Sequence, residues 1–226
     1  MAAFLVFPAI SGAAIISGNI NGAGVLTLTN GLVTFSNAGV GLGSFVVDVT
    51  STGSFVPLIG KAATVQPLNQ VTEPTGPVGT FAPVPNFITF AGSPISVTLT
   101  AVDPATLPAT NCLTPAASAA AGQVCGTGPF NLFNLSPTRS SDSFGIQGTV
   151  SDGSASPAST LTGVFTAQFS DKSFEAVRDT VLAGGSVTTS YSASFTASAV
   201  PEPATLSFMG LGLLAIAAGV RRRARQ

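Results

Sequence analysis

The sequence contains no histidine and no tryptophan, and only 8% of its 226 residues are charged. Without histidine, the Ser-His-Asp and Cys-His arrangements and the histidine-based metal sites are excluded. Neither a phosphate-binding glycine-rich motif before a helix nor a D-x-[DN]-x-[DN]-G calcium loop is present, although a calcium site built from distant loops stays open. The sequence therefore predicts no cofactor, no metal site and no catalytic residue.

Basic residues are scarce outside the last six positions. Residues 1–199 hold four basic and eight acidic side chains, which gives this part a formal charge of −4. A mildly acidic body without a basic patch argues against nucleic-acid binding. Most acidic residues adjoin turn signals, as in Asp103-Pro104 and Asp152-Gly153, so turn or capping roles explain them. We expect the protein not to be an enzyme, and a carboxylate-based glycosidase is kept as a remote alternative.

Cysteine occurs twice, as Cys112 and Cys125, in a stretch rich in small residues. A cysteine nucleophile normally needs a basic partner, and no histidine is present to serve as one. Zinc would need about two further Cys or His ligands, which the sequence does not contain. In an exported chain the pair is expected to form a disulfide, which would stabilise the fold by roughly 3 kcal/mol in the chain-entropy model.

The body of the chain shows the period of two that is typical of antiparallel strands. In 95–101, for example, Val97 and Leu99 share one face while Thr98 and Thr100 share the other. The ranges with the clearest alternation are 95–101, 144–150, 161–169 and 187–197. Weaker candidates are 24–29, 32–35, 44–49 and 87–90. Asn30-Gly31 is a hairpin turn signal between two of them. The 16 phenylalanines are expected mainly in the core.

One short helix is predicted over 173–182, because Phe174, Val177 and Val181 recur at helical spacing and Gly184-Gly185 follow. The strand–helix–strand segment around it is expected to close the domain. Residues 51–85 and 103–138 are rich in proline or small residues and are predicted as extended edges or long loops. The fold class is therefore mainly β: an antiparallel β-sandwich or jelly-roll-like domain over 15–199, with a C-terminal transmembrane helix after it.

The last 27 residues contain three parts in a fixed order: Val200-Pro201-Glu202-Pro203, an uncharged apolar run over 204–220, and a basic end at 221–226. As a helix, 17 apolar residues rise about 25 Å, the short end of a membrane span. The positive-inside bias places the basic end in the cytoplasm and the body beyond the inner membrane. The basic residues are Arg221, Arg222, Arg223 and Arg225. The alternative is a buried helix of a soluble core, but the run lacks a polar face.

This tail resembles the PEP-CTERM protein-sorting signal of Gram-negative bacteria, over residues 200–226. The resemblance implies recognition and processing by an exosortase, a membrane-embedded cysteine peptidase, near Pro201-Glu202-Pro203. It also implies export, first as an inner-membrane precursor with the domain on the periplasmic side and then at the cell surface or outside. Such tails are attached to many unrelated domains, so the resemblance implies no biochemical activity for the rest of the chain.

At the other end, residues 1–14 combine an apolar run with small residues, and we interpret them as a truncated signal peptide. The alternative is a first strand over Phe4–Phe7, because no basic residue precedes the run. For the whole protein we expect a surface- or matrix-associated structural role with weak contacts to extracellular polysaccharide. A carbohydrate- or surface-binding module is the alternative, although Tyr191 is the single tyrosine and tryptophan is absent.

Overall fold

The computed structural model describes residues 16–36, 39, 41–69, 79–154, 158–199 and 212. These residues are mainly β, as predicted, with one α-helix among them, α1 Phe174–Leu182, and two short 3-10 helices at Gly53–Leu58 and Ala116–Ser118. The strands are β1 Gly18–Thr29, β2 Leu32–Thr34, β3 Gly43–Val47, β4 Ala62–Val65, β5 Leu68–Asn69, β6 Gly79–Phe90, β7 Ser96–Val102, β8 Val124–Thr127, β9 Phe130–Ser136, β10 Arg139–Ser151, β11 Ser159–Phe169 and β12 Val187–Ser198.

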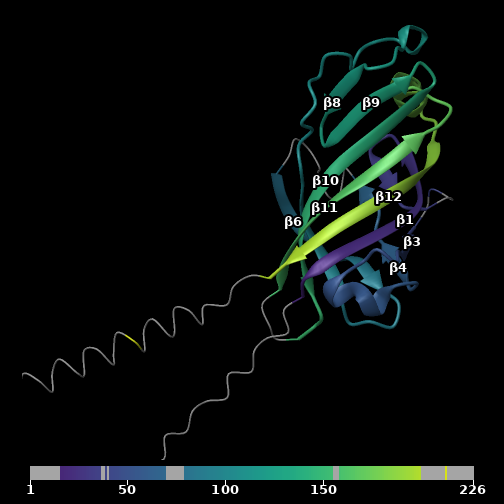
Figure 1. The fold of residues 1–226 in the computed structure, drawn as a ribbon. Helices are drawn as coiled ribbons and strands as arrows, with labels where there is room; N and C mark the ends of the chain where they lie inside the picture. The colour runs from purple at the N-terminus through teal and green to yellow at the C-terminus, as the bar shows by residue number, and fades with distance from the viewer. Residues whose placement is uncertain are drawn as a thin grey trace, which may run out of the picture.

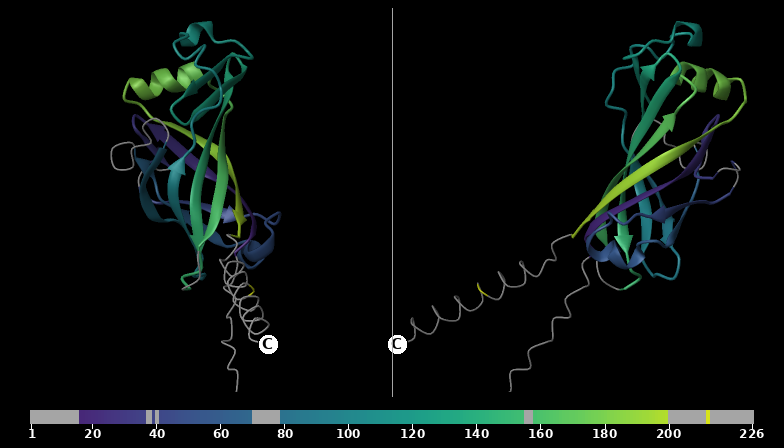
Figure 2. Two further views of the ribbon diagram at one scale, coloured as in Figure 1. Left: turned by 90° about the vertical axis from the view of Figure 1, so that its left-hand side faces the viewer. Right: turned by 45° about the vertical axis from the view of Figure 1, so that its right-hand side comes forward.

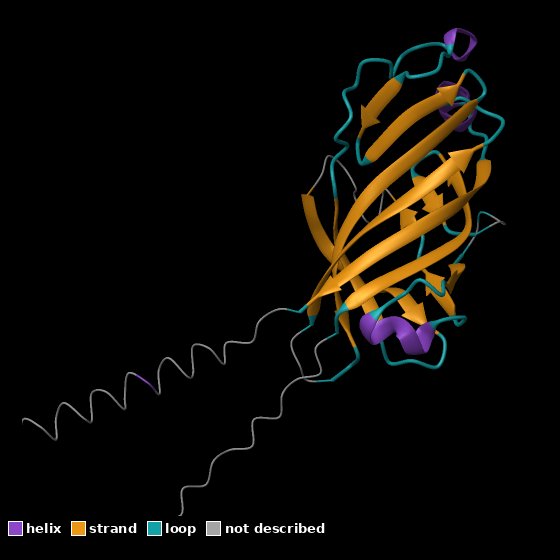
Figure 3. Ribbon diagram, in the orientation of Figure 1, coloured by secondary structure: helices purple, strands orange, loops and turns teal. Residues whose placement is uncertain are grey.

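Eight of the strands form a single antiparallel sheet that closes on itself (Figures 1 and 3). The order is β11-β12-β1-β3-β4-β6-β7-β10, and β10 pairs again with β11. The predicted sandwich of two packed sheets is therefore wrong in architecture, although the antiparallel strands are confirmed. The physical reason lies in β10, which is 13 residues long and hydrogen-bonds to β11 on one side and to β7 on the other. Because the sheet closes, each of the eight strands has a hydrogen-bonded neighbour on both sides.

The interior of the closed sheet is filled by the predicted alternating faces. Val97, Leu99, Ile146, Leu161 and Phe195 are each at most 1% exposed, and their polar neighbours along the strands face outward. Phe165 lies at the centre of this core. Its ring centroid is within 5.7 Å of those of four other rings, which belong to Phe35, Phe144, Tyr191 and Phe195. The prediction that phenylalanine supplies the core is confirmed for these side chains.

The two segments predicted as extended edges or long loops include regular strands. The first, 51–85, includes β4, β5 and the start of β6. The second, 103–138, includes the β8–β9 hairpin, which pairs with the first part of β10 where β10 extends beyond β7. Strand β9 escaped prediction because its pattern is inverted: Asn134 is buried, whereas Phe133 and Leu135 are exposed. Period-two reasoning assigns the apolar residues to the inside and so fails there.

Helix α1 forms where it was predicted and joins β11 to β12, and β12 in turn pairs with β1. The Ser173 hydroxyl accepts a hydrogen bond from the Ala176 N–H at 3.3 Å and so caps the helix N-terminus. Gly184, at a φ of 82°, follows its C-terminus. Helix α1 and the β8–β9 hairpin lie at one end of the closed sheet, and the end of β12 lies at the other (Figure 2).

Candidate functional site

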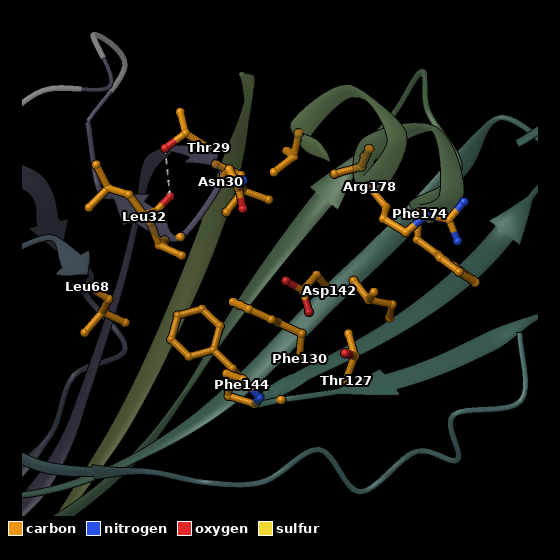
Figure 4. Close-up of a pocket in the computed structure, with 18 of the residues that line it drawn as sticks. Thr29, Asn30, Leu32, Leu68, Thr127, Phe130, Asp142, Phe144, Phe174 and Arg178 are labelled. Atoms are coloured by element: carbon orange, nitrogen blue, oxygen red, sulfur yellow. Dashed lines mark hydrogen bonds between the residues drawn. The ribbon is translucent and has the colours of Figure 1, made fainter. Parts of the chain in front are cut away.

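A pocket of about 360 Å³ opens at the α1 end of the closed sheet (Figure 4). Three parts of the chain enclose it: the β1–β2 hairpin on one side, the β8–β9 hairpin with β10 on another, and α1 above. Its lining is mostly apolar, including Leu32, Leu68, Phe130, Phe144, Phe174 and Val181. A pocket of this size and character, in the mouth of a closed sheet, is the usual setting for a small-molecule site.

Asp142 places a carboxyl group in this apolar lining. It precedes Phe144 by two residues on β10 and so points to the same inward face, opposite Leu132 of β9 and Ala167 of β11. It is only 4% exposed. Figure 4 shows its carboxyl group among the side chains of Phe130, Phe144 and Phe174. A polar side chain therefore occupies a core position of the strand.

The Asp142 carboxyl group is poorly compensated by its surroundings. Its Oδ1 atom is buried and has no hydrogen-bond partner. Burial raises the pKa of Asp142 from 3.8 to about 8, and a hydrogen bond with the Ser143 backbone only partly opposes this shift. The carboxyl group is therefore mainly protonated at neutral pH and can both donate and accept a hydrogen bond within the pocket.

A buried polar contact fixes α1 over the pocket. The Asn134 side chain of β9 donates from Nδ2 to Glu175 Oε2 at 2.7 Å, and its Oδ1 accepts from the Phe174 backbone N–H at 2.9 Å. Asn134 and Glu175 are both 0% exposed. The Ser140 hydroxyl of β10 donates to the Lys172 carbonyl at 2.9 Å just before the helix. The first turn of α1, which brings Phe174 to the pocket, is thus held by the adjoining strands.

Arg178 connects α1 to the cysteine loop. Its guanidinium group donates to the Cys112 carbonyl, to the Thr114 carbonyl at 2.9 Å and to Asp179 Oδ1 at 2.6 Å. Cys112 and Cys125 form a disulfide, as predicted, and Cys125 belongs to β8. The disulfide therefore lies beside the pocket wall, and the loop that it closes is hydrogen-bonded to the helix above the pocket.

The sequence did not single out Asp142, and Asn134 and Glu175 were missed as a pair. A signal for Asp142 was present, because continuing the alternation of Phe144, Ile146 and Val150 backwards by one step places a carboxylate on the apolar face. No such signal exists for Asn134 and Glu175, since they are 41 residues apart and meet only through the fold. Among the described residues, no three His, Cys, Asp or Glu side chains are placed to hold a metal ion.

The outer surface of the closed sheet, over β11, β12 and β1, carries short uncharged polar side chains. Register places Thr162, Thr196 and Asn19 side by side, and the Thr196 hydroxyl donates to Asn19 Oδ1 at 3.0 Å. Ser192, Ser194 and Ser198 of β12 are also exposed. The hydroxyl face is defined as residues 160, 162, 166, 192, 194, 196, 198, 19 and 21, none of which is charged. The exposed Val164 lies among them, beside Ser194.

The predicted sorting and membrane residues lie outside the described residues. These are the signal segment 1–14, Val200, Pro201, Glu202, Pro203, the apolar run 204–220 apart from Gly212, Arg221, Arg222, Arg223 and Arg225. Within the part of the chain that the structure describes, no helix has the length and apolar character to cross a membrane.

Comparison with known proteins concerns this same end of the chain. Neither a curated protein nor a solved structure gives a significant match. One family model does match, the PEP-CTERM protein-sorting motif, over residues 199–223. The match includes Val200-Pro201-Glu202-Pro203 and Arg221–Arg223, and it ends before Arg225. The chain therefore carries a C-terminal PEP-CTERM protein-sorting motif, which makes it similar to exported proteins that an exosortase processes.

Proposed function

We propose that this protein is a structural component of the cell surface or extracellular matrix, without catalytic activity. The precursor is held in the inner membrane by residues 204–220, with the closed sheet on the periplasmic side. The exosortase then acts near Pro201-Glu202-Pro203 and passes the folded body to the outside. There the hydroxyl face makes weak contacts with extracellular polysaccharide.

The hydroxyl face is the observation that carries this proposal. Ser192, Ser194 and Thr196 stand beside Thr162, Thr166 and Asn19 on three adjacent strands. Short hydroxyl and amide groups can donate and accept hydrogen bonds to sugar hydroxyls without the desolvation cost of a charge. Because strands lie about 4.8 Å apart, the face repeats such groups in two directions. This arrangement suits many weak contacts with a polymer better than one tight contact with a small sugar.

The two alternatives have less support. A sugar-binding groove would need exposed aromatic rings, but Phe133 is the one exposed aromatic side chain among those described, and Tyr191 is 2% exposed. A glycosidase would need two carboxyl groups about 5–10 Å apart across a cleft. Asp142 is the one carboxyl group among the residues that line the pocket at the α1 end. We therefore favour the structural role.

Co-sedimentation with the exopolysaccharide of the producing strain tests the proposal. The full chain is expressed in that strain, and the released protein is mixed with the purified polymer. We expect Ser194→Arg to reduce the bound fraction several-fold, because a long charged side chain interrupts the hydroxyl face. Thr89→Arg, at an outward position of β6 that is three strands from both β1 and β11, is the matched control and should leave binding unchanged. Equal binding by both variants would count against the hydroxyl face.

A further inference from the structure

We propose that the pocket beneath α1 binds a neutral amphiphile, an aliphatic chain that ends in a hydroxyl group, with the hydroxyl hydrogen-bonded to Asp142. The residues that line this pocket do not belong to the hydroxyl face. It rests on three features: an apolar pocket, one buried carboxyl group without a partner for Oδ1, and walls that are fixed in place.

The apolar lining determines the body of the ligand. Leu32 and Leu68 on one side and Phe130, Phe174 and Val181 on the other leave about 360 Å³ between them. This volume is at the lower end of the range for small-molecule pockets and suits one unbranched chain of about eight to ten carbons. An apolar chain gains free energy there in proportion to the area that it removes from water.

Asp142 determines the head group. Its Oδ1 atom is buried without a partner, and leaving such an atom unsatisfied is unfavourable. A ligand hydroxyl can donate a hydrogen bond to the Asp142 carboxyl oxygen and can accept one from the carboxyl O–H. It can therefore bond to Asp142 in the ionised and in the protonated form. The hydroxyl head would thus bond to Asp142, while the chain would contact the apolar part of the lining.

The charged residues around the pocket disfavour ionic heads. Arg178 is the other charged side chain in the lining, and its guanidinium group is already bonded to Asp179 and to the carbonyls of Cys112 and Thr114. A carboxylate ligand would therefore find no free cation in the described lining. An ammonium ligand would require Asp142 to ionise in an apolar site, where a buried ion pair gains little over its desolvation cost. A neutral hydroxyl avoids both costs.

The walls of the pocket are preformed. The Asn134–Glu175 contact fixes the first turn of α1, and Arg178 fixes the following turn to the disulfide loop. A ligand that enters a preformed site loses less free energy to ordering of the protein. The Asn134–Glu175 and Arg178 contacts thus hold α1 in place above the pocket.

Isothermal titration calorimetry with 1-octanol tests the proposal. The full chain is reconstituted in phospholipid nanodiscs, and empty nanodiscs are titrated in parallel to subtract partitioning of the alcohol into lipid. We expect saturable binding of one 1-octanol molecule per chain. Asp142→Leu should weaken it about tenfold, which corresponds to the loss of one hydrogen bond in an apolar site. Asp142→Asn retains a donor and an acceptor and should stay within a few-fold of the original chain.

Octylammonium and octanoate serve as ligand controls, and both should bind more weakly than 1-octanol. Ser192→Leu on the hydroxyl face is the control variant and should not change the affinity. Circular dichroism establishes that each variant is folded. The proposal would be overturned by an absence of saturable 1-octanol binding, by equal affinity in Asp142→Leu and the original chain, or by tighter binding of octylammonium than of 1-octanol.

Discussion

Asn134 and Glu175 are hydrogen-bonded at 2.7 Å while both are completely buried, and this contact joins β9 to the first turn of α1. Two polar side chains thus occupy a position where apolar packing would be expected. The same Asn134 side chain also receives the Phe174 N–H, one of the backbone donors that a helix N-terminus leaves without an intrahelical partner. One amide group therefore makes two of the contacts that hold the first turn of α1 over the pocket.

The first prediction concerns this amide. Asn134→Leu keeps the approximate volume but leaves Glu175 and the Phe174 N–H without partners, so it should lower the free energy of unfolding by about 3 kcal/mol. Glu175→Gln still offers Asn134 an acceptor oxygen and should cost about 1 kcal/mol or less. Urea denaturation followed by circular dichroism measures both. Equal destabilisation by the two variants would show that the contact with Asn134 is not what matters.

The second prediction concerns pH. Asp142 binds its proton more tightly in the folded state, with a pKa of about 8, than in the unfolded chain, where the ordinary value is 3.8. The folded state therefore holds the extra proton between these two values, and the protein should lose stability as the pH rises from about 4 to about 8. The Arg178 guanidinium, bonded elsewhere, does not offset this loss.

Asp142→Asn removes the titration. At pH 4 the variant and the original chain should unfold at similar urea concentrations, whereas at pH 9 the variant should be more stable by a few kcal/mol. The two stability profiles are compared across this range. If they run parallel from pH 4 to pH 9, Asp142 does not titrate as its burial requires.

The third prediction concerns the disulfide between Cys112 and Cys125. Replacing both cysteines with serine should lower the free energy of unfolding by about 3 kcal/mol, because the unfolded chain regains the freedom of the open loop. Arg178 holds the same loop through the Cys112 and Thr114 carbonyls. Amide hydrogen exchange should therefore accelerate around Cys112 and in α1 while the strands of the closed sheet stay protected. Uniform acceleration across the sheet would contradict this local role.

The fourth prediction concerns close packing between β11 and β12. A Cβ atom at Gly163 would lie 2.1 Å from Cδ1 of the Phe195 ring, which is fully buried. Gly163→Ala should therefore cost about 1–3 kcal/mol through overpacking, whereas Val164→Ala, next to it but exposed, should cost under about 0.5 kcal/mol. Thermal unfolding measures both. Combining Gly163→Ala with Phe195→Leu should be less harmful than the sum of the two single changes.

The sequence predicted the strands whose interior faces are mainly apolar, such as β7 and β12, and it predicted α1 and the glycines that follow it. It did not predict how the sheet closes, because closure depends on β10 pairing with both β7 and β11, which are non-local contacts. The inverted β9 shows a second limit. Asn134 faces inward only because Glu175, 41 residues away, arrives to bond with it.

The candidate site was less predictable than the fold. Its Asp142 could be found by extending an alternating run, but the apolar walls come from hairpins and a helix that meet only after folding. The sorting tail is the opposite case, because its three parts are contiguous and the family match rests on the same residues. A motif of contiguous residues can be recognised in a sequence, whereas a pocket formed by distant segments cannot be predicted from it.

The most direct test of this account is the processing of a chain in which Pro201-Glu202-Pro203 is replaced by Ala-Ala-Ala. Gel mobility and cell fractionation of the variant are compared with those of the original chain in the producing strain. We expect the variant to accumulate as a larger precursor in the inner membrane, while the original chain is shortened and reaches the cell surface or the medium. Identical mobility and identical fractionation of the two chains would contradict sorting through the PEP-CTERM motif.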